Sequence, residues 1–534
     1  MARRTEPSRQ YPKWTVLGAG PFTGVSDSEA PAASRNGRCK SIVNAYRQIG
    51  QNTIRIVGRP GSTIAGAAMG SGPIQLVCQF TKTTGTEYTV AISGGEIYTY
   101  SWGSDAWTKQ VSTANLTTAS ITLSGTANMY AVAFQDTLVI SDGVNVPITW
   151  DGSSGAGGLV ELTNAPVTYG QPVVYYTKLF LIKSTERDTI VWSEEGTANT
   201  GYEAGGYNNA WSIGGTKSEG LYAFAPRNDS LGLLRARSTT TIQGAVNDAF
   251  TSTGTRASVS EAIGSASPGG TIVLDDGTVT LDADGFPQYW PQGGGYAQSP
   301  SMADDCLQTL LSVPRTALAN AQWTYDPETN LVQLWLGDTS TNNLTQGLCF
   351  EWTGTTPNFV GLWTLPRTAT RVGMVKDSSG VPRLMHGTSA GTVYYHGTPM
   401  GTQWTDSNTP ITHSVVGPAL GYDTDIEANF DQLTLVGFSS SGMTNCRVDY
   451  ETPYGVPTTA QTVTFTGSGF ILDVSSLDVD TLTDAAGELR RRIGISAFGR
   501  WIRPRITHSN GSERFGLELM TVRALAEGAP AEAT

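Results

Sequence analysis

Short apolar runs that alternate with polar residues recur along most of this chain, and polar turns separate them. Residues 321–352 show the unit most clearly, with a turn at DPETN, the run LVQLWL, a second turn at DTSTNN and the run LTQGLCFEW. A strand with one buried face alternates apolar and polar side chains, and a tight turn needs Asp, Asn, Pro or Gly. The pattern therefore predicts antiparallel β-hairpins.

Hairpins of this kind are expected in seven regions of the chain before residue 404. They are centred near residues 77–100, 130–150, 172–193, 221–243, 271–290, 323–352 and 371–396. Small sheets repeated around an axis bury their faces against their neighbours, which is how a β-propeller limits exposed sheet edges. We therefore predict an all-β fold with a β-propeller of six or seven irregular blades.

After residue 401 the alternating runs become longer, as in FDQLTLVGF at 430–438 and FGLELMTV at 515–522. Long strands with separated partners are typical of a β-sandwich. The expected organisation has four segments: an extended N-terminal arm over 1–40 that orders only on a partner, a β-propeller over 41–404, a C-terminal β-sandwich-like domain over 405–524 and a flexible tail over 525–534. One or two helical turns are expected between blades, at residues 303–313.

Composition and charge narrow the range of functions. The 534 residues include 62 Gly, 13 Trp and 20 Tyr and only 15% charged residues, which argues against long helices. The net charge of −12 argues against wrapping nucleic acid on a broad basic surface, because such binding neutralises phosphates with Lys and Arg. DNA remains possible as a passing cargo, since a channel in which DNA slides should avoid cations that hold phosphates. The N-terminus lacks the apolar core of a secretion signal and no window has the roughly 20 apolar residues of a membrane helix, so we expect a soluble cytosolic chain without membrane insertion.

Motifs that suggest catalysis each have a simpler structural interpretation. The string GTSAG at 387–391 fits the G-x-S-x-G pattern of hydrolases, but strand-forming residues follow it where a helix is required, so a hairpin turn is expected. Ser141, Asp142 and Gly143 with Trp150 have the residues of a sialidase Asp-box without its spacing, which indicates a turn and a core tryptophan. No facing carboxylate pair can be chosen among the 46 acidic residues, and no phosphate-binding loop follows the GxxxxGK[ST] pattern.

Cysteine and histidine are too dispersed for a metal site. The cysteines are expected to be free and mostly buried, and the histidines are scattered, although two of them flank one predicted hairpin. These residues are Cys39, Cys78, Cys306, Cys349, Cys446, His386, His396, His413 and His508. The tryptophans at strand ends are expected to pack between blades rather than to bind sugar. We predict no catalytic, metal or cofactor-binding residue and no enzymatic activity.

One basic cluster is the densest positive charge in this acidic chain. It consists of Arg490, Arg491, Arg492, Arg500, Arg503 and Arg505. It is either a solvated face of the last domain or a contact to an acidic surface of a neighbouring subunit or adaptor. The same alternatives apply to Arg3, Arg4 and Arg9 in the arm.

Several segments, taken in order, resemble the tail nozzle proteins of short-tailed bacteriophages, the group that includes packaged-DNA stabilisation and tail tubular B-type proteins. The segments are NAYRQIGQNTIRIVGRPGS at 44–62, AWSIGG followed by LYAFAPRNDSLGLLRARSTTTIQG within 210–244, IGSASPGGTIVLDDGTVTLDADG at 263–285, YDPETNLVQLW at 325–335, HGTSAGTVYYHG at 386–397 and GRWIRPRITHSNGSERFGLELMTVRAL at 499–525. The resemblance covers most of the chain and depends on the joint order of these segments.

The resemblance implies a structural protein of the virion tail that is assembled in the host cytoplasm. Its implied form is a homo-oligomeric ring of six copies beneath the connector, with a central channel that retains packaged double-stranded DNA and conducts it during ejection without sequence recognition. The implied partners are a tail adaptor or connector protein and tail fibres or spikes. Two alternatives from other classes stay open, a tail-associated glycan hydrolase with a carboxylate pair and a carbohydrate-binding propeller used for adhesion.

Overall fold

The chain is all-β, and its contacts divide it into two compact units. The computed structural model describes residues 15–19, 22–28, 37–49, 54–70, 72–198, 210–212, 219–244, 255–260, 263–291, 302–337, 343–354, 357–398, 403–421, 426–438, 443–455, 460–465 and 488–526. One unit, the propeller unit, consists of Gly61–Phe359 and Trp363–Gly401. The other, the sandwich unit, consists of Met1–Pro60, Val360–Leu362 and Thr402–Thr534.

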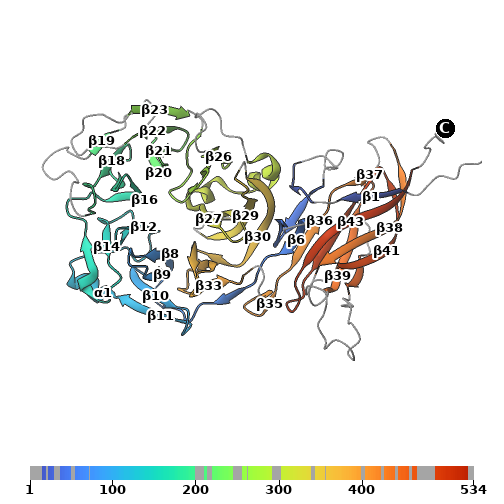
Figure 1. Cartoon of the computed structure of the whole chain (residues 1–534), viewed down its shortest axis with the longest axis horizontal. Coiled ribbons are helices and arrows are strands. Elements are labelled where there is room, and N and C mark those ends of the chain that lie inside the picture. Colours follow the sequence, from blue (N-terminus) through green and yellow to red (C-terminus); the bar gives the residue numbers. More distant parts are fainter. Residues whose placement is uncertain are drawn as a thin grey trace, which may run out of the picture. The chain divides into compact units, whose positions relative to one another are not determined.

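The propeller unit contains seven small antiparallel sheets, which follow one another around an axis (Figure 1). The first four are β8 (Ile74–Thr81), β9 (Glu87–Ser93), β10 (Glu96–Ser101) and β11 (Ala106–Val111); β12 (Tyr130–Phe134), β13 (Thr137–Ser141), β14 (Ile148–Trp150) and β15 (Leu159–Glu161); β16 (Thr168–Tyr175), β17 (Lys178–Lys183), β18 (Thr189–Trp192) and β19 (Ala210–Ser212); and β20 (Leu221–Pro226), β21 (Ser230–Arg235), β22 (Thr239–Gln243) and β23 (Thr255–Ser260).

The remaining three sheets complete the ring. They are β24 (Thr271–Leu274), β25 (Gly277–Leu281) and β26 (Pro287–Pro291); β27 (Gln322–Asp326), β28 (Leu331–Leu336), β29 (Leu344–Glu351) and β30 (Asn358–Ala369); and β31 (Arg371–Lys376), β32 (Pro382–Gly387), β33 (Val393–His396) and β7 (Ser62–Ile64). The described sheets match the seven predicted hairpin regions one for one, which confirms the predicted propeller.

The last blade closes the ring with a strand from the beginning of the unit. Strand β7 pairs antiparallel with β33, with Thr63 opposite Tyr395. Strand β31 of this blade also lies beside β8 of the first blade. The circle therefore has no open sheet edge between its first and last blades, which removes a surface that could pair with other chains.

The turn between β9 and β10 contains the glycines that a tight hairpin needs. Gly94 and Gly95 join β9 to β10 with φ of 57° and 80°, the positive values that a tight two-residue hairpin turn requires. A Cβ on Gly95 would lie 3.2 Å from the carbonyl oxygen of Leu123, so glycine serves both conformation and space there.

The core of the propeller unit lies between neighbouring blades. One cluster joins the first two sheets through Phe80 and Trp150, whose ring centroids are 6.1 Å apart. Another joins the third and fourth sheets through Trp192 and Leu233. Trp150, Trp192 and Trp335 are fully buried, which confirms the prediction that these tryptophans pack in the core.

Helical structure in the described residues is limited to short segments between blades. These are α1 (Thr113–Thr118), α2 (Leu307–Leu311) and the 3₁₀ turns η1 (Ala156–Gly158), η2 (Asp304–Cys306) and η3 (Arg315–Asn320). The helical turns predicted at residues 303–313 are confirmed by η2 and α2. Across the described ranges, no helix has the length and apolarity that a membrane span requires.

The sandwich unit packs two sheets face to face. The first contains β41 (Glu488–Gly499), β38 (Ala428–Phe438), β43 (Gly516–Ala526), β6 (Ile54–Gly58) and β5 (Ala45–Ile49) in that order, with β1 (Thr15–Ala19) also paired to β43. The second contains β4 (Ser41–Val43), β36 (His413–Val416), β42 (Trp501–His508), β39 (Met443–Glu451) and β40 (Gln461–Phe465), with β37 (Leu420–Gly421) on β42. Residues 360–362 of β30 belong to this unit, and Leu362 pairs in parallel with Val43 of β4. Phe430 and Val522 of the first sheet pack with Leu420 and Ile502 of the second, as in the predicted β-sandwich.

Two pairs of very short strands complete the unit. β2 (Gly24–Val25) pairs in parallel with β3 (Arg38–Cys39), and β34 (Thr405–Asp406) pairs antiparallel with β35 (Thr409–Pro410).

The start of the chain differs from the predicted organisation. Residues 45–58 were expected to open the propeller, but β6 pairs with β43 and buries Ile56 and Val57 in the sandwich unit. Residues 15–19 belong to the arm that was predicted to become ordered only on a partner. In the structure they pair with strand β43 of the same chain. Local alternation indicates a strand but not its partner, and these partners lie hundreds of residues away in the sequence.

Two further expectations fall partly outside the described residues. Residues 470–474 of the predicted sandwich-like domain and residues 527–534 of the predicted tail lie outside them. Leu525 and Ala526, which the prediction assigned to the tail, end strand β43.

Candidate functional site

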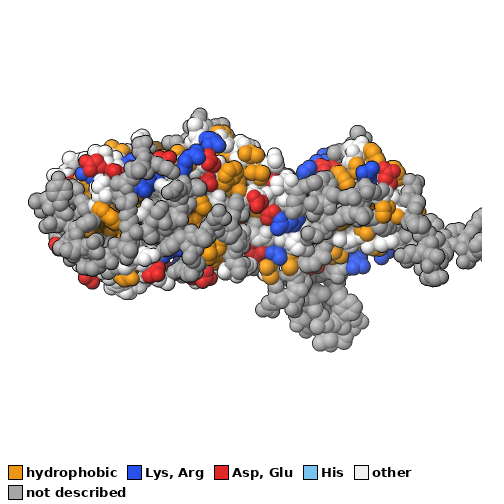
Figure 2. All heavy atoms as spheres, turned by 90° about the horizontal axis from the view of Figure 1, so that it is seen from above, with side chains coloured by type: hydrophobic (Ala, Val, Ile, Leu, Met, Phe, Trp, Pro, Cys, Tyr) orange, Lys and Arg blue, Asp and Glu red, His pale blue; other side chains and the backbone are white. Residues whose placement is uncertain are grey.

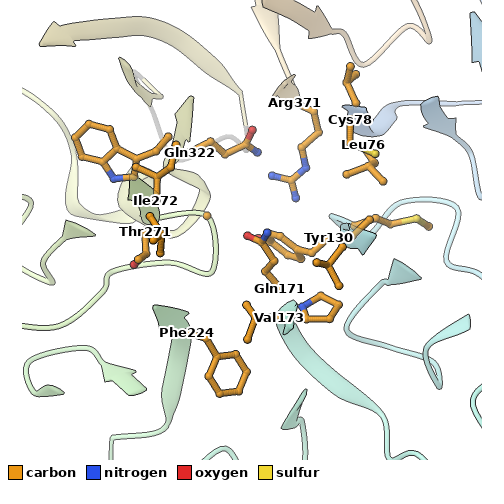
Figure 3. A pocket seen from close by; sticks show the side chains of 18 of the residues that line it. Leu76, Cys78, Tyr130, Gln171, Val173, Phe224, Thr271, Ile272, Gln322 and Arg371 are labelled. Atoms are coloured by element: carbon orange, nitrogen blue, oxygen red, sulfur yellow. The ribbon is translucent and has the colours of Figure 1, made fainter. Parts of the chain in front are cut away.

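A cavity lies on the axis of the propeller, and the first strand of every blade contributes to its wall (Figure 3). Its volume is about 480 Å³, within the range of small-ligand pockets. The side chains that bear on the argument below are Leu76, Tyr130, Gln171, Phe224, Gln322 and Arg371. A DNA duplex cannot pass through a cavity of this size, because its major groove alone is about 12 Å wide.

Arg371, at the start of β31, lines this cavity and is only 3% exposed. Its Nε donates a hydrogen bond of 3.0 Å to the backbone carbonyl of Gln75. Its guanidinium carbon lies 5.2 Å from the centre of the Tyr130 ring, and Figure 3 shows the side chain pointing into the cavity. No hydrogen bond of normal geometry reaches either Nη atom. The phenol of Tyr130 also interacts with this guanidinium, and the described lining residues offer its far end no carboxylate.

The surroundings of Arg371 contain no compensating acid. Burial lowers the pKa of Arg371, and the group that favours its charged form is the phenol of Tyr130. An arginine keeps its charge even when buried, because its reference pKa is very high. The described wall of the cavity includes no Asp or Glu, so this positive charge is not neutralised locally.

Two amides accompany the guanidinium in a wall that is otherwise mostly apolar. Gln322 is held in place because its Oε1 accepts a hydrogen bond of 3.0 Å from the backbone nitrogen of Val372. Gln171 reaches the middle of the cavity from β16 (Figure 3). Leu76 and Phe224 provide apolar surface beside them. The cavity thus combines one cation, two amides and hydrophobic walls.

A second hollow adjoins the axial cavity. Its volume is about 530 Å³, and it shares Val174, Pro226 and Val273 with the axial cavity. It extends to Tyr176 and Asp275, which are exposed and lie in turns after the first strand of their blades. The axial cavity therefore adjoins the surface on the side of the propeller where these turns lie.

These turns carry an acidic surface, here named the acidic turn face. It comprises the exposed residues Asp136, Asp229, Asp275, Asp276 and Glu328, all in turns between the first and second strands of their blades. Asp377 lies in the corresponding turn of the last blade but is mostly buried and pairs with Arg383 at 2.8 Å. The pKa of Glu328 is raised first by burial and then by the charges of Asp326 and Asp377, so turns of neighbouring blades interact. Lys376 also lies in this region, 3.9 Å from Glu87.

The predicted basic cluster is divided by the structure. Arg503 and Arg505 of β42 form ion pairs with Glu451 and Asp449 of β39, with shortest distances of 3.4 and 2.6 Å. The Nε of Arg491 donates to the backbone carbonyl of Thr464 at 2.7 Å. These three guanidiniums are engaged within the sandwich unit.

The other three arginines of the cluster are exposed. Arg490 and Arg492 lie two residues apart on β41, so their side chains share one face of this edge strand, and Arg500 lies in the turn to β42. The predicted contact to an acidic surface stays a prediction for these exposed side chains. On the face shown in Figure 2, Lys and Arg are interspersed with Asp and Glu among the described residues.

The catalytic-looking motifs form turns, as predicted. Gly387 ends β32, and residues 388–391 lie in the turn to β33, where the nitrogen of Thr388 donates to the carbonyl of Thr392 at 2.9 Å. The carboxylate of Asp142 accepts hydrogen bonds from the backbone nitrogens of Val144 and Asn145 and caps its own turn. Trp150, the residue that completed the Asp-box comparison, is fully buried.

The histidines are buried and have structural contacts. Nδ1 of His386 lies 3.1 Å from Nε2 of His396. Nδ1 of His413 is 2.7 Å from the carbonyl of Asn44, and burial lowers the pKa of His413 to about 3, so it is a neutral donor. Among the described residues, no group of three or more His, Cys, Asp or Glu is arranged to hold a metal ion.

The cysteines are free thiols in the structure. Cys39, Cys306, Cys349 and Cys446 are buried and Cys78 is partly buried, in agreement with the prediction. Burial raises the pKa of Cys78 to about 12, so the thiol beside the axial cavity stays protonated and a poor nucleophile.

The sequence analysis did not identify Arg371, although the sequence contains a pattern that could have identified it. The segment TATRVGMV places an arginine inside an apolar strand. In the structure its cross-strand partner is Gly387, so the hairpin supplies no carboxylate opposite it. A lone arginine in a strand without an acidic partner is therefore the pattern that could have identified this position.

Comparisons with known proteins show similarity in fold only. A scan against models of protein families found no match, and a search of curated proteins found none either. Solved structures that resemble the chain include YCF48 bound to D1 peptide, with a TM-score of 0.38, 8% identity and coverage of 64% of this chain and 98% of that chain. The Cps50 (Swd1) β-propeller domain of Myceliophteria thermophila has a TM-score of 0.40, 10% identity and coverage of 63% and 100%. The N-terminal domain of Nup159 has a TM-score of 0.37, 11% identity and coverage of 64% and 95%.

Proposed function

We propose that this chain is a structural component of a short bacteriophage tail, a nozzle protein that assembles into a ring and retains packaged DNA until ejection. The proposal starts from the ordered resemblance of segments along the sequence. It is supported by the architecture, in which the chain folds into a closed propeller and a β-sandwich that need no catalytic site. Its expected place is the virion tail, after assembly in the host cytoplasm.

The observation that carries the proposal is the separation of charge between two surfaces. The sandwich unit exposes Arg490 and Arg492 on an edge strand, whereas the propeller unit exposes the acidic turn face. A surface on one copy that complements a different surface on the next copy gives a head-to-tail contact, and such contacts close into rings. The same arginines could instead meet an acidic surface of the adaptor.

The conduit for DNA is assigned to the space between copies rather than to the propeller itself. Side chains reduce the space on the propeller axis to a cavity of about 480 Å³. We therefore assign no DNA channel to the propeller itself. In a ring of six copies, the duplex passes along subunit surfaces. The chain's net charge of −12 limits adhesion to phosphate, so DNA moves without sequence recognition. The neighbouring proteins are a connector or adaptor and tail fibres or spikes.

The test is the oligomeric state of the purified full-length chain with and without its connector. Light scattering and negative-stain images should show a ring of six copies, and Arg490→Glu with Arg492→Glu should prevent ring formation or connector binding. The matched control is Arg237→Glu with Arg315→Glu, which reverses two exposed arginines of the propeller unit. The control should assemble normally.

Two results would contradict the proposal. A chain that stays monomeric with its connector and cleaves capsular polysaccharide would favour the glycan hydrolase. A monomer that binds the polysaccharide without cleaving it would favour the adhesion propeller. Normal ring assembly by the Arg490→Glu, Arg492→Glu variant would remove these arginines from the interface while leaving the ring itself intact.

A further inference from the structure

The axial cavity contains a buried positive charge whose donors are only partly used. Arg371 is buried, its Nε donates to the carbonyl of Gln75, and the phenol of Tyr130 interacts with its guanidinium. Neither Nη atom has a partner of normal geometry among the described residues. Burying a charge without a partner is costly, and proteins normally pair such groups. The described wall of the cavity supplies no anion for this charge, so a bound anionic ligand would neutralise it.

The hydrogen bond to Gln75 fixes which edge of the guanidinium faces the cavity. Gln75 is itself held firmly, because its Nε2 donates to the carbonyls of Ser124 and Ala127 at 2.8 and 2.7 Å, and its Oε1 accepts from Gly95. With Nε engaged on this anchor, the remaining donors are Nη1 and Nη2. Two such donors match the two oxygens of a carboxylate, which arginine binds through parallel hydrogen bonds.

The rest of the wall favours a particular class of anion. Leu76, Phe224 and Ile272 provide apolar surface, and the cavity has one cation only among its described lining residues. A doubly charged phosphate would keep one charge uncompensated in these surroundings. A carboxylate with a short apolar body would be neutralised by Arg371 and would place its body against the hydrophobic wall.

We propose that the axial cavity is a binding site for a monocarboxylate, held by Nη1 and Nη2 of Arg371 with its apolar body among the first strands of the blades. Gln322 and Gln171 are placed to contact the same ligand. The second hollow, which adjoins the axial cavity and reaches Tyr176 and Arg227, gives the ligand a route from the surface. The carboxylate belongs either to a free small organic acid or to the end of a peptide chain.

The test measures binding to the full-length protein by calorimetry and by thermal shift. The probes are hexanoate, its neutral analogue hexanol, inorganic phosphate and a short acetylated peptide with a free C-terminal carboxylate. Hexanoate or the peptide should bind, and the preference between these two identifies the source. The affinity should fall about tenfold or more in Arg371→Met, the loss expected for a charge-assisted hydrogen-bond pair. Arg315→Met, an exposed arginine of the same unit, should bind as the wild type does.

Several results would overturn the site. Hexanol binding as tightly as hexanoate, phosphate binding more tightly than both carboxylates, or no binding of either carboxylate would each do so. Equal binding of hexanoate to the wild type and to Arg371→Met would also do so. The comparison of hexanoate with hexanol uses the wild-type protein, so it decides the question even if the variant does not fold.

Discussion

Arg59 of the sandwich unit and Arg371 of the propeller unit are both buried, and they differ in what neutralises the charge. In the sandwich unit Arg59 is 2% exposed, and its Nη atoms reach both oxygens of Asp406 at 3.0 and 2.5 Å. Its Nε donates to Oδ1 of Asn44 at 3.0 Å. In the propeller unit Arg371 is equally buried but has a backbone carbonyl for Nε and no carboxylate. Arg59 and Arg371 are therefore buried to a similar extent, but only Arg59 has a carboxylate partner among the described residues.

The largest expected effect follows from breaking the completed pair. Asp406→Ala would leave Arg59 buried without its carboxylate, and loss of one partner of a buried pair costs about 3–5 kcal/mol of folding free energy. The measurement is denaturant unfolding of the purified chain. The control is Asp431→Ala, which removes the acid from the more exposed pair with Arg523 and should cost at most about 1 kcal/mol. A smaller loss for Asp406→Ala than for its control would show that Arg59 does not depend on this partner.

Acid should weaken the sandwich unit through its buried histidines. The pKa of His413 is about 3 in the folded protein against 6.5 when unfolded, so between these values the unfolded state binds the extra proton. The contribution to stability is therefore present above pH 6.5 and is lost as the pH falls toward 3, with a slope of up to about 1.4 kcal/mol per pH unit. Burial also lowers the pKa of His508, which acts in the same direction.

The check is the unfolding free energy at pH 7 and pH 5 for the wild type and for His413→Gln. The wild type should lose about 2 kcal/mol over this interval, and the variant should lose less. Equal losses would assign the acid sensitivity to other groups, among them Glu513, whose pKa is lowered in part by hydrogen bonds from Thr444 and His508.

The unneutralised arginine should contribute little to folding. Arg371→Met removes a buried charge and one hydrogen bond and keeps an apolar side chain in the cavity wall. The unfolding free energy should change by no more than about 1 kcal/mol in either direction. A loss as large as that of Asp406→Ala would show that Arg371 is a structural residue like Arg59, and the contrast between the two units would disappear.

The exposed arginines of β41 form a third case with the smallest expected effect on stability. Arg490→Glu with Arg492→Glu should change the unfolding free energy by less than about 0.5 kcal/mol, because surface substitutions away from special features rarely cost more. The measurement is denaturant unfolding at a concentration where the chain is monomeric. A loss of several kcal/mol would show that these side chains support the sandwich rather than an interface.

The repeating hairpins could be predicted from the sequence because each is local. Turns such as Gly94–Gly95 and the alternating runs beside them lie within one short segment, and the seven sheets appear where the pattern predicts them. The partners of the first strands could not be predicted, because β6 pairs with a strand that begins at Gly516. Alternation shows that Ile56 and Val57 are buried but not what buries them.

The same limit explains why the two buried arginines could not be told apart in the sequence. Asp406, the acid that neutralises Arg59, lies 347 residues further along the chain, so no local sequence pattern predicts this pair. Arg371 lies in a mostly apolar strand. Only the folded propeller shows that the described residues around its cavity include no Asp or Glu. The basic cluster as a whole was identified from the sequence, whereas the ion pairs of Arg503 and Arg505 depend on the register of β39 and β42.

The sandwich contains strands from before and after the propeller unit in the sequence. During synthesis, β5 and β6 leave the ribosome long before their partner β43 exists, so the seven blades are made before this pairing can form. The propeller can close as soon as β33 meets β7, but the sandwich can form only after β43 has been synthesised. A surface that depends on the complete sandwich is therefore formed later than the propeller.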